Sequence, residues 1–146
     1  MEQQPAGLPI QIRFVTEIRE GTRKETIAFD TNGLYYEKGQ STYVTFQEPN
    51  EQGAINTIMK IRGDEVLIMR SGAVSMRQTH KKGELTNGTY NSELGTFSLE
   101  TKTDNVLFEW SDKRKKGRLF LTYALRLNSS EAGRYTITIT FKEEQK

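Results

Sequence analysis

The stretch "RLFLTYALRLNSSEAGRYTITITFK", residues 118–142, decides the fold class. Apolar side chains occupy every second position of each half: Leu119, Leu121, Tyr123, Leu125 and Leu127, then Tyr135, Ile137, Ile139 and Phe141. A period of two is that of a β-strand with one buried and one solvated face. The intervening "NSSEAG" is rich in turn-forming residues, so the stretch predicts two strands joined as a hairpin.

The same period recurs along most of the chain. Further strands are expected at residues 10–19, 24–30, 34–38, 42–48, 55–62, 65–71, 74–80, near 89–91, 96–102 and 106–111. "DTNG", residues 30–33, is expected to end the second of them. No long segment has a convincing 3.6-residue period, so little helix is expected. Strands joined mostly by tight turns predict an all-β fold, an antiparallel up-and-down closed barrel of about 8–10 strands.

Length and composition limit the functional classes. The 146 residues predict a single β-barrel domain spanning 1–146, with residues 1–9 as a flexible N-terminal arm. The net charge of +2 indicates no particular partner. The absence of cysteine excludes disulfides, thiolate metal ligands and a cysteine nucleophile. The opening "MEQQPAGLPI" lacks the pattern of a signal peptide and no segment has the length of a membrane span, so a cytoplasmic protein without membrane attachment is expected.

One hairpin can be worked out residue by residue. With a two-residue loop at 63–64, Thr57 lies opposite Arg70 on the same face as the neighbouring aliphatic pairs. That face predicts the barrel interior, so Arg70 is expected to point inward near one end. A guanidinium there needs a carboxylate, carbonyls, water or an anionic ligand, because burying it unpaired costs several kcal/mol. A ligand anchor and an internal salt bridge both remain open.

The turn at residues 72–74 has two alternative registers. A two-residue loop would turn inward Ser75, Arg77 and Thr79. A three-residue loop would instead turn inward Met76, Gln78 and His80. We favour the second register, because it avoids two arginines in one interior and because Gly72 can adopt the positive φ that such a loop needs.

Chemistry-bearing motifs are scarce. His80, the single histidine, is expected either to line a cavity mouth or to lie in solvent beside two lysines, and one histidine without a carboxylate cluster cannot build a zinc site. No nucleophile elbow or phosphate-gripping glycine loop occurs, so we expect no enzyme, no catalytic residue, no metal and no cofactor. The acidic residues at strand ends are expected to face solvent: Glu17, Glu20, Glu48 and Glu51.

The most basic stretch is "DKRKKGR", residues 112–118. Its positive side chains could contact phosphates, but the stretch separates two predicted strands and has no interleaved aromatic residues to stack on bases. A solvated turn is therefore favoured. RNA or polyanion binding through residues 112–118 is the weaker alternative, and a nucleic-acid partner is not expected.

Several segments together resemble a known family. They are "GLYYEKGQSTYVTFQE" at 33–48, "RSG" at 70–72, "YNSELG" at 90–95 followed by "FSLETKT", and "LFLTYALRL" at 119–127. In this order and spacing they are similar to the uncharacterised bacterial YwiB-like proteins, from Ile10 to Phe141, with Phe46 and Ser92 standing where tyrosine and threonine are expected. The resemblance implies a lipocalin-like calycin barrel and, by analogy, a small apolar or amphipathic ligand inside it.

Two functions follow as hypotheses. The first is a non-enzymatic barrel that binds a small apolar or amphipathic molecule in its interior. The predicted ligand-binding residues are Arg70, Thr57, Met76, His80, Tyr123 and Tyr135. The alternative is a structural or protein-interaction module whose interior is filled by its own side chains and which could form a homodimer.

Overall fold

Ten strands account for almost the whole of the described chain. The computed structural model describes residues 7–144, and these residues contain no helix. The strands are β1 (Leu8–Glu20), β2 (Arg23–Lys38), β3 (Ser41–Glu48), β4 (Ile55–Arg62), β5 (Glu65–Gly72), β6 (Ser75–Lys81), β7 (Leu85–Ser92), β8 (Gly95–Ser111), β9 (Lys116–Leu127) and β10 (Ser130–Glu143). Within residues 7–144 there is accordingly no helix long and apolar enough to cross a membrane.

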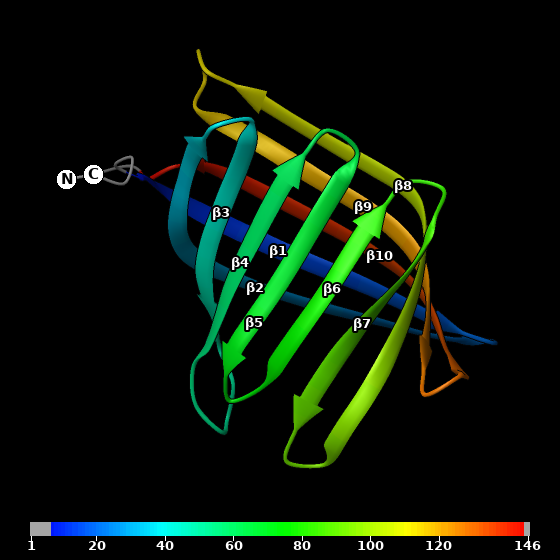
Figure 1. The fold of residues 1–146 in the computed structure, drawn as a ribbon. Helices are drawn as coiled ribbons and strands as arrows, with labels where there is room; N and C mark the ends of the chain where they lie inside the picture. The colour runs from blue at the N-terminus through cyan, green and yellow to red at the C-terminus, as the bar shows by residue number, and fades with distance from the viewer. Residues whose placement is uncertain (1–6, 145–146) are drawn as a thin grey trace.

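The strands form one closed antiparallel ring. Each strand pairs with its neighbours in the sequence, and β1 pairs with β10 to close the barrel, with Ile12 opposite Phe141 and Phe14 opposite Ile139. The ring is flattened, so that β4, β5 and β6 cross in front of β1, β9 and β10 (Figure 1). The predicted all-β, up-and-down closed barrel is confirmed, with ten strands.

Side chains of the strands fill the space inside the ring. Alternate residues point inward, and the largest of those with almost no exposed surface are Ile10, Ile12, Met59, Ile68, Leu119, Leu121 and Ile139. They belong to one hydrophobic cluster to which strands on both sides of the flattened ring contribute. The barrel is therefore stabilised by a continuous core, as a sandwich of two sheets would be.

The hairpin registers follow the sequence analysis. Thr57 lies opposite Arg70 across β4 and β5. Arg70 lies opposite Met76 across β5 and β6, and Met76, Gln78 and His80 are buried, which is the register of the three-residue loop. Gly72 has a φ of 108°, a conformation that side chains other than glycine rarely adopt.

Several predicted strand boundaries were wrong. Residues 30–33 continue β2 instead of ending a strand, and β8 runs through the predicted gap between 102 and 106 with a bulge between Thr103 and Asn105. The short piece near 89–91 belongs to the longer β7. Leu8 and Pro9, placed in the flexible arm at 1–9, lie in β1, because Leu8 pairs with Tyr35. Residues 1–6 of that arm lie outside the described residues.

Gly33 explains why β2 continues through "DTNG". β2 pairs with β1 as far as Tyr35 and with β3 from Gly33 onward, so the strand turns there from one side of the ring to the other. A Cβ atom on Gly33 would lie 2.2 Å from the carbonyl oxygen of Thr45 and 2.8 Å from Cδ1 of Ile12. Glycine therefore marks a barrel corner here.

We expect Gly33→Ala to lower the free energy of unfolding by about 2 kcal/mol, because the added methyl group forces two strands apart. Urea unfolding followed by tryptophan fluorescence measures this change. Asn32→Ala, at the neighbouring exposed position, is the matched control and should change stability by less than about 0.5 kcal/mol. Equal stability of the two variants would contradict the corner assigned to Gly33.

Candidate functional site

The interior arginine is paired with a carboxylate of the chain itself. Nε of Arg70 lies 2.6 Å from Oε2 of Glu48, and Thr57 Oγ1 donates a hydrogen bond of 2.5 Å to the same oxygen. Nη1 of Arg70 lies 3.2 Å from the sulfur of Met76. Both charged side chains are largely buried, 19% exposed for Arg70 and 12% for Glu48. The expectation that Glu48 faces solvent was therefore wrong.

The sequence contained a signal for this ion pair. Val44 and Phe46 precede Glu48 at spacing two in β3, and both are buried. Continuing that alternation puts Glu48 on the inward face, where Thr57 and Arg70 were already expected. Glu48 was expected in solvent because it lies at the end of a strand, although the period of two already predicted that it faces the interior.

His80 lies inside the core, and this corrects both of the places expected for it, the cavity mouth and the solvent. Its side chain has no exposed surface, its Nδ1 lies 3.3 Å from Oγ1 of Thr103, and its Nε2 has no hydrogen-bond partner in the described chain. The ring lies 4.5 Å from that of Tyr123, which stacks on Tyr135 at 5.2 Å. Burial, with the charge of Arg70 as a smaller cause, lowers the pKa of His80 to about 4.

The predicted ligand-binding residues thus lie together, but their side chains contact one another and Glu48. Burial raises the pKa of the Tyr123 hydroxyl, as expected for a phenol in the core. Gln78 donates a hydrogen bond of 3.0 Å to Thr101, which satisfies a second buried polar pair. Among residues 7–144 no group of histidine and acidic side chains could hold a metal ion. Chemically, this cluster serves as a polar part of the packed core.

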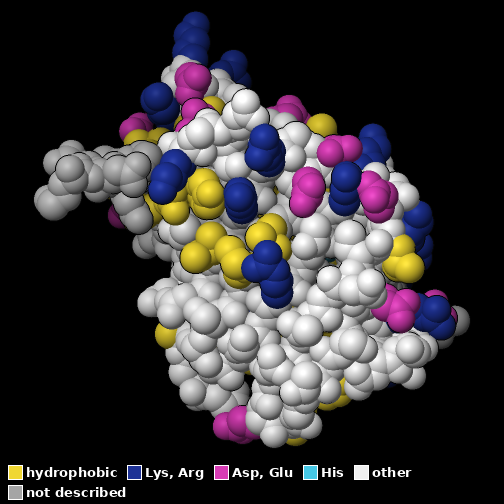
Figure 2. Space-filling model, viewed as in Figure 1, with side chains coloured by type: hydrophobic (Ala, Val, Ile, Leu, Met, Phe, Trp, Pro, Cys, Tyr) yellow, Lys and Arg dark blue, Asp and Glu magenta, His cyan; other side chains and the backbone are white. Residues whose placement is uncertain are grey.

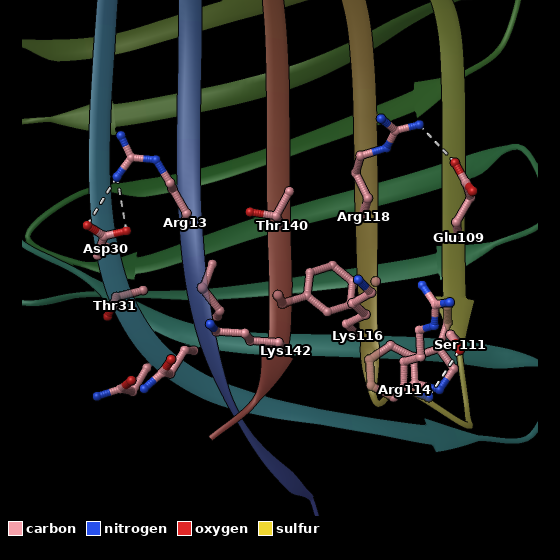
Figure 3. A pocket seen from close by; sticks show the side chains of 16 residues that line it. Arg13, Asp30, Thr31, Glu109, Ser111, Arg114, Lys116, Arg118, Thr140 and Lys142 are labelled. Atoms are coloured by element: carbon pink, nitrogen blue, oxygen red, sulfur yellow. Dashed lines mark hydrogen bonds and ion pairs between the residues drawn. The ribbon is translucent and has the colours of Figure 1, made fainter. Parts of the chain in front are cut away.

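A groove of about 1150 Å³ lies on the outer side of the barrel. It crosses β2, β1, β10, β9 and β8, whose outward side chains form two parallel rows across the sheet (Figure 3). By register, the first row is Asp30, Arg13, Thr140, Arg118 and Glu109. The second row is Asn32, Gln11, Lys142, Lys116 and Ser111.

The charges of the first row cancel in pairs. Nη1 of Arg13 lies 3.2 Å from the carboxylate of Asp30, and Nη2 of Arg118 lies 2.9 Å from that of Glu109 (Figure 3). Thr140 separates the two pairs. Both ion pairs are solvent-exposed, so they contribute little to stability, but they do match the carboxylates of this row with cations.

The second row carries positive charge without a carboxylate. Lys142 and Lys116 lie directly opposite each other on β10 and β9, and Arg114 lines the same groove from the turn between β8 and β9. None of the three forms an ion pair within residues 7–144. Like charges at opposite positions destabilise a sheet, so this row is a site where an anion would relieve repulsion.

The basic stretch is thus more than an exposed turn. Residues 112–115 form the turn as expected, but Arg114, Lys116 and Arg118 all line the groove. Sequence reasoning missed Lys142 and Arg13, which come from β10 and β1. The predicted hairpin of residues 118–142 already indicated that Lys142 lies near Lys116, because the two residues stand at its open end.

The opposite outer face carries apolar side chains interspersed with Thr45, Lys60, Thr79 and Arg77. Leu34, Ile58 and Met69 lie in one cross-strand row over β2, β4 and β5. The adjacent row contains Tyr36, Tyr43 and Leu67. Leu34 is 42% exposed and Ile58 38%. Figure 2 shows hydrophobic side chains gathered over this front sheet with Lys and Arg side chains among them. We call these two rows the apolar face.

The fold defines the class of the protein, a closed ten-stranded antiparallel β-barrel. Residues 12–139 match the family described as a domain of unknown function, DUF1934, and the chain belongs to this family. It is 31% identical over 134 residues to the uncharacterised β-barrel protein YwiB of Bacillus subtilis strain 168, covering 92% of this chain and 93% of that protein. The crystal structure of the ywiB protein from Bacillus subtilis matches with a TM-score of 0.85 and 30% identity, covering 95% of this chain and 94% of that one. The resemblance to YwiB-like proteins is confirmed.

We expect stability to fall on mild acidification because His80 is buried as a neutral group. Its pKa of about 4 in the folded chain lies below the ordinary value of 6.5, so the unfolded chain binds the proton more tightly. The contribution is complete above pH 6.5 and is lost as the pH falls toward 4, by about 3 kcal/mol in total. Urea unfolding from pH 7 to 4 measures it, with His80→Gln as the control whose profile should be flatter. An imidazole NMR titration centred near pH 6.5 would contradict this burial.

Proposed function

We propose that this chain is a non-enzymatic binding protein, whose barrel is filled and whose outer groove holds a ligand carrying phosphate or a similar anionic group. The opposed pair Lys116 and Lys142, with Arg114 beside it, carries the proposal. The up-and-down topology of the barrel also supports a place for this chain among lipocalin-like, calycin barrels, although those barrels hold their ligands inside.

The groove supplies what an oxyanion needs. Two ammonium groups can donate to the anion from neighbouring strands, and Gln11, Asn32 and Ser111 add neutral polar groups in the same row. Hydrogen bonds to charged groups are worth roughly 1.5–3 kcal/mol when they form, less at an exposed site. The carboxylates of the neighbouring row are already held by arginines, which favours binding over proton transfer.

The interior is a less favourable place for a ligand. A ligand carboxylate would have to displace Glu48 from Arg70, and an apolar ligand would have to displace packed aliphatic side chains. Val44, Val66, Leu119 and Leu121 have no exposed surface, as expected of side chains that fill the interior themselves. The contacts of Arg70 therefore support an internal salt bridge, and the ligand role predicted for it remains a prediction.

We expect inorganic pyrophosphate to bind the groove. Lys116→Ala and Lys142→Ala should each weaken that binding about tenfold, which corresponds to about 1.4 kcal/mol of binding free energy. Isothermal titration calorimetry at low salt measures the affinities. Neither variant should lower the free energy of unfolding, because each removes a repulsion. Lys60→Ala, on the apolar face, is the matched control and should bind as the original chain does. Affinity unchanged in all three variants would refute the proposed site.

The apolar face supports a second candidate function, a protein-interaction module that forms a homodimer. Stacked Tyr36 and Tyr43, 4.9 Å apart, lie at one side of this face, and Arg77 lies at the other, in the row of Met69. A two-fold axis through the middle of the face would put the tyrosines of one copy over Arg77 of the other, a favourable cation–π arrangement. Exposed apolar side chains gathered on one face and accompanied by polar ones often mark an interface.

Sedimentation equilibrium tests this second candidate. We expect the chain to dimerise reversibly and Ile58→Lys, at the centre of the apolar face, to be monomeric because it buries a charge in the contact. Leu85→Lys, at an exposed leucine in β7, is the control and should still dimerise. A monomer at all concentrations, with or without the substitutions, would rule the homodimer out.

A further inference from the structure

A second row of cations lies on the same outer side of the barrel as the groove. Lys24 of β2 lies opposite Arg19 of β1, and Arg19 lies opposite Arg134 of β10. They line a smaller hollow of about 520 Å³, together with Glu17 and Asp104. Arg134 is paired with Asp104, whereas Lys24 and Arg19 form no ion pair in the described part of the chain. Like charges therefore oppose each other at two separate places on one face.

The two cationic rows are connected by shared strands. Strands β1, β2, β8, β9 and β10 contribute to both hollows. Along β10, the rows are separated by the eight residue steps from Lys142 to Arg134, about 26 Å at the rise of an extended strand. Midway between them lies a row with apolar members: Val15, Thr138, Phe120 and Leu107. Leu107 is 44% exposed.

We infer that the two rows form one track for single-stranded nucleic acid, with phosphates at the cations and bases over the apolar row between them. This inference rests on the proposed function and names the substrate class of the same site. A single small anion cannot reach both rows across about 26 Å. A single strand carries charges at regular intervals together with flat apolar bases, and the separation suits a strand of roughly four nucleotides or more.

Other polyanions fit this face less well. An acidic peptide supplies the charges but not the flat apolar groups that would cover Phe120 and Leu107. Asp30, Glu109 and Asp104 on this face are each held by an arginine, which leaves Glu17, beside Arg19 in the smaller hollow, as the carboxylate of the two hollows that forms no ion pair within residues 7–144. The face thus combines the two features by which single strands are bound without regard to sequence, cationic contacts and an apolar platform.

The experiment compares four ligands, which are oligothymidylate, a dinucleotide, a polyglutamate peptide and pyrophosphate, and two double variants of the full chain. Fluorescence anisotropy follows a labelled 12-nucleotide oligothymidylate, and calorimetry follows pyrophosphate, both in 50 mM salt. The variants are Lys116→Glu with Lys142→Glu in the groove, and Arg19→Glu with Lys24→Glu in the second row. Lys60→Glu serves as the control for charge reversal on the apolar face. Thermal unfolding shows that each variant is folded.

We expect both double variants to weaken oligothymidylate binding at least tenfold and Lys60→Glu to leave it unchanged. The second-row variant should bind pyrophosphate as the original chain does. Its oligothymidylate affinity should also depend less steeply on salt, by about 0.7 in logarithmic slope for each phosphate that the substituted side chains no longer neutralise.

Three results would overturn the inference. They are unchanged oligothymidylate affinity in the second-row variant, oligothymidylate bound no more tightly than a dinucleotide, and a 12-residue polyglutamate peptide bound equally well. Each of them leaves the proposed function intact if pyrophosphate still binds through Lys116 and Lys142. Failure of the original chain to bind pyrophosphate, with oligothymidylate bound normally, would instead refute the small-anion site and leave the track.

Discussion

The side chains of the strands fill the ring that they form, and this packing holds the barrel together. Closure of β1 against β10 gives every strand two neighbours and brings inward-facing residues from all sides into contact, although β6 and β7 pair only over residues 75–77 and 89–91. Because Leu119, Leu121 and Ile139 have no exposed surface, the flattened barrel is a core and not a container. The proposed binding sites accordingly lie on the outer faces, which differ in chemistry.

The interior polar groups contact other side chains of the interior, as expected for a filled barrel. Glu48 neutralises Arg70, Thr57 supplies a further hydrogen bond to the same carboxylate, and His80 stays neutral between Thr103 and Tyr123. A buried ion pair of this kind adds little net stability, although removing one partner would leave a costly unmatched charge.

Period and turn chemistry predicted the fold class, the register of two hairpins and the inward direction of Arg70. They failed where a long strand passes through turn-forming residues, as at Gly33, because only the neighbouring strands show that the chain must bend there without ending. The groove could be read from the sequence only in part. Lys116 and Lys142 meet within the predicted hairpin of β9 and β10, whereas Arg13 joins them only through barrel closure, which the pattern of one hairpin does not show. The inward direction of Glu48, by contrast, could have been predicted from the alternation of buried residues in β3.

We propose that the barrel binds its ligand on the outside, because its interior is filled. Backbone amide chemical shifts of the isotope-labelled chain, recorded by NMR during a titration with pyrophosphate, test it most directly. We expect the perturbed amides to cluster at residues 11–13, 114–118 and 140–142. Perturbations centred instead on Thr57, Arg70 and residues 76–80 would contradict it, because they would place the ligand among the side chains of the core.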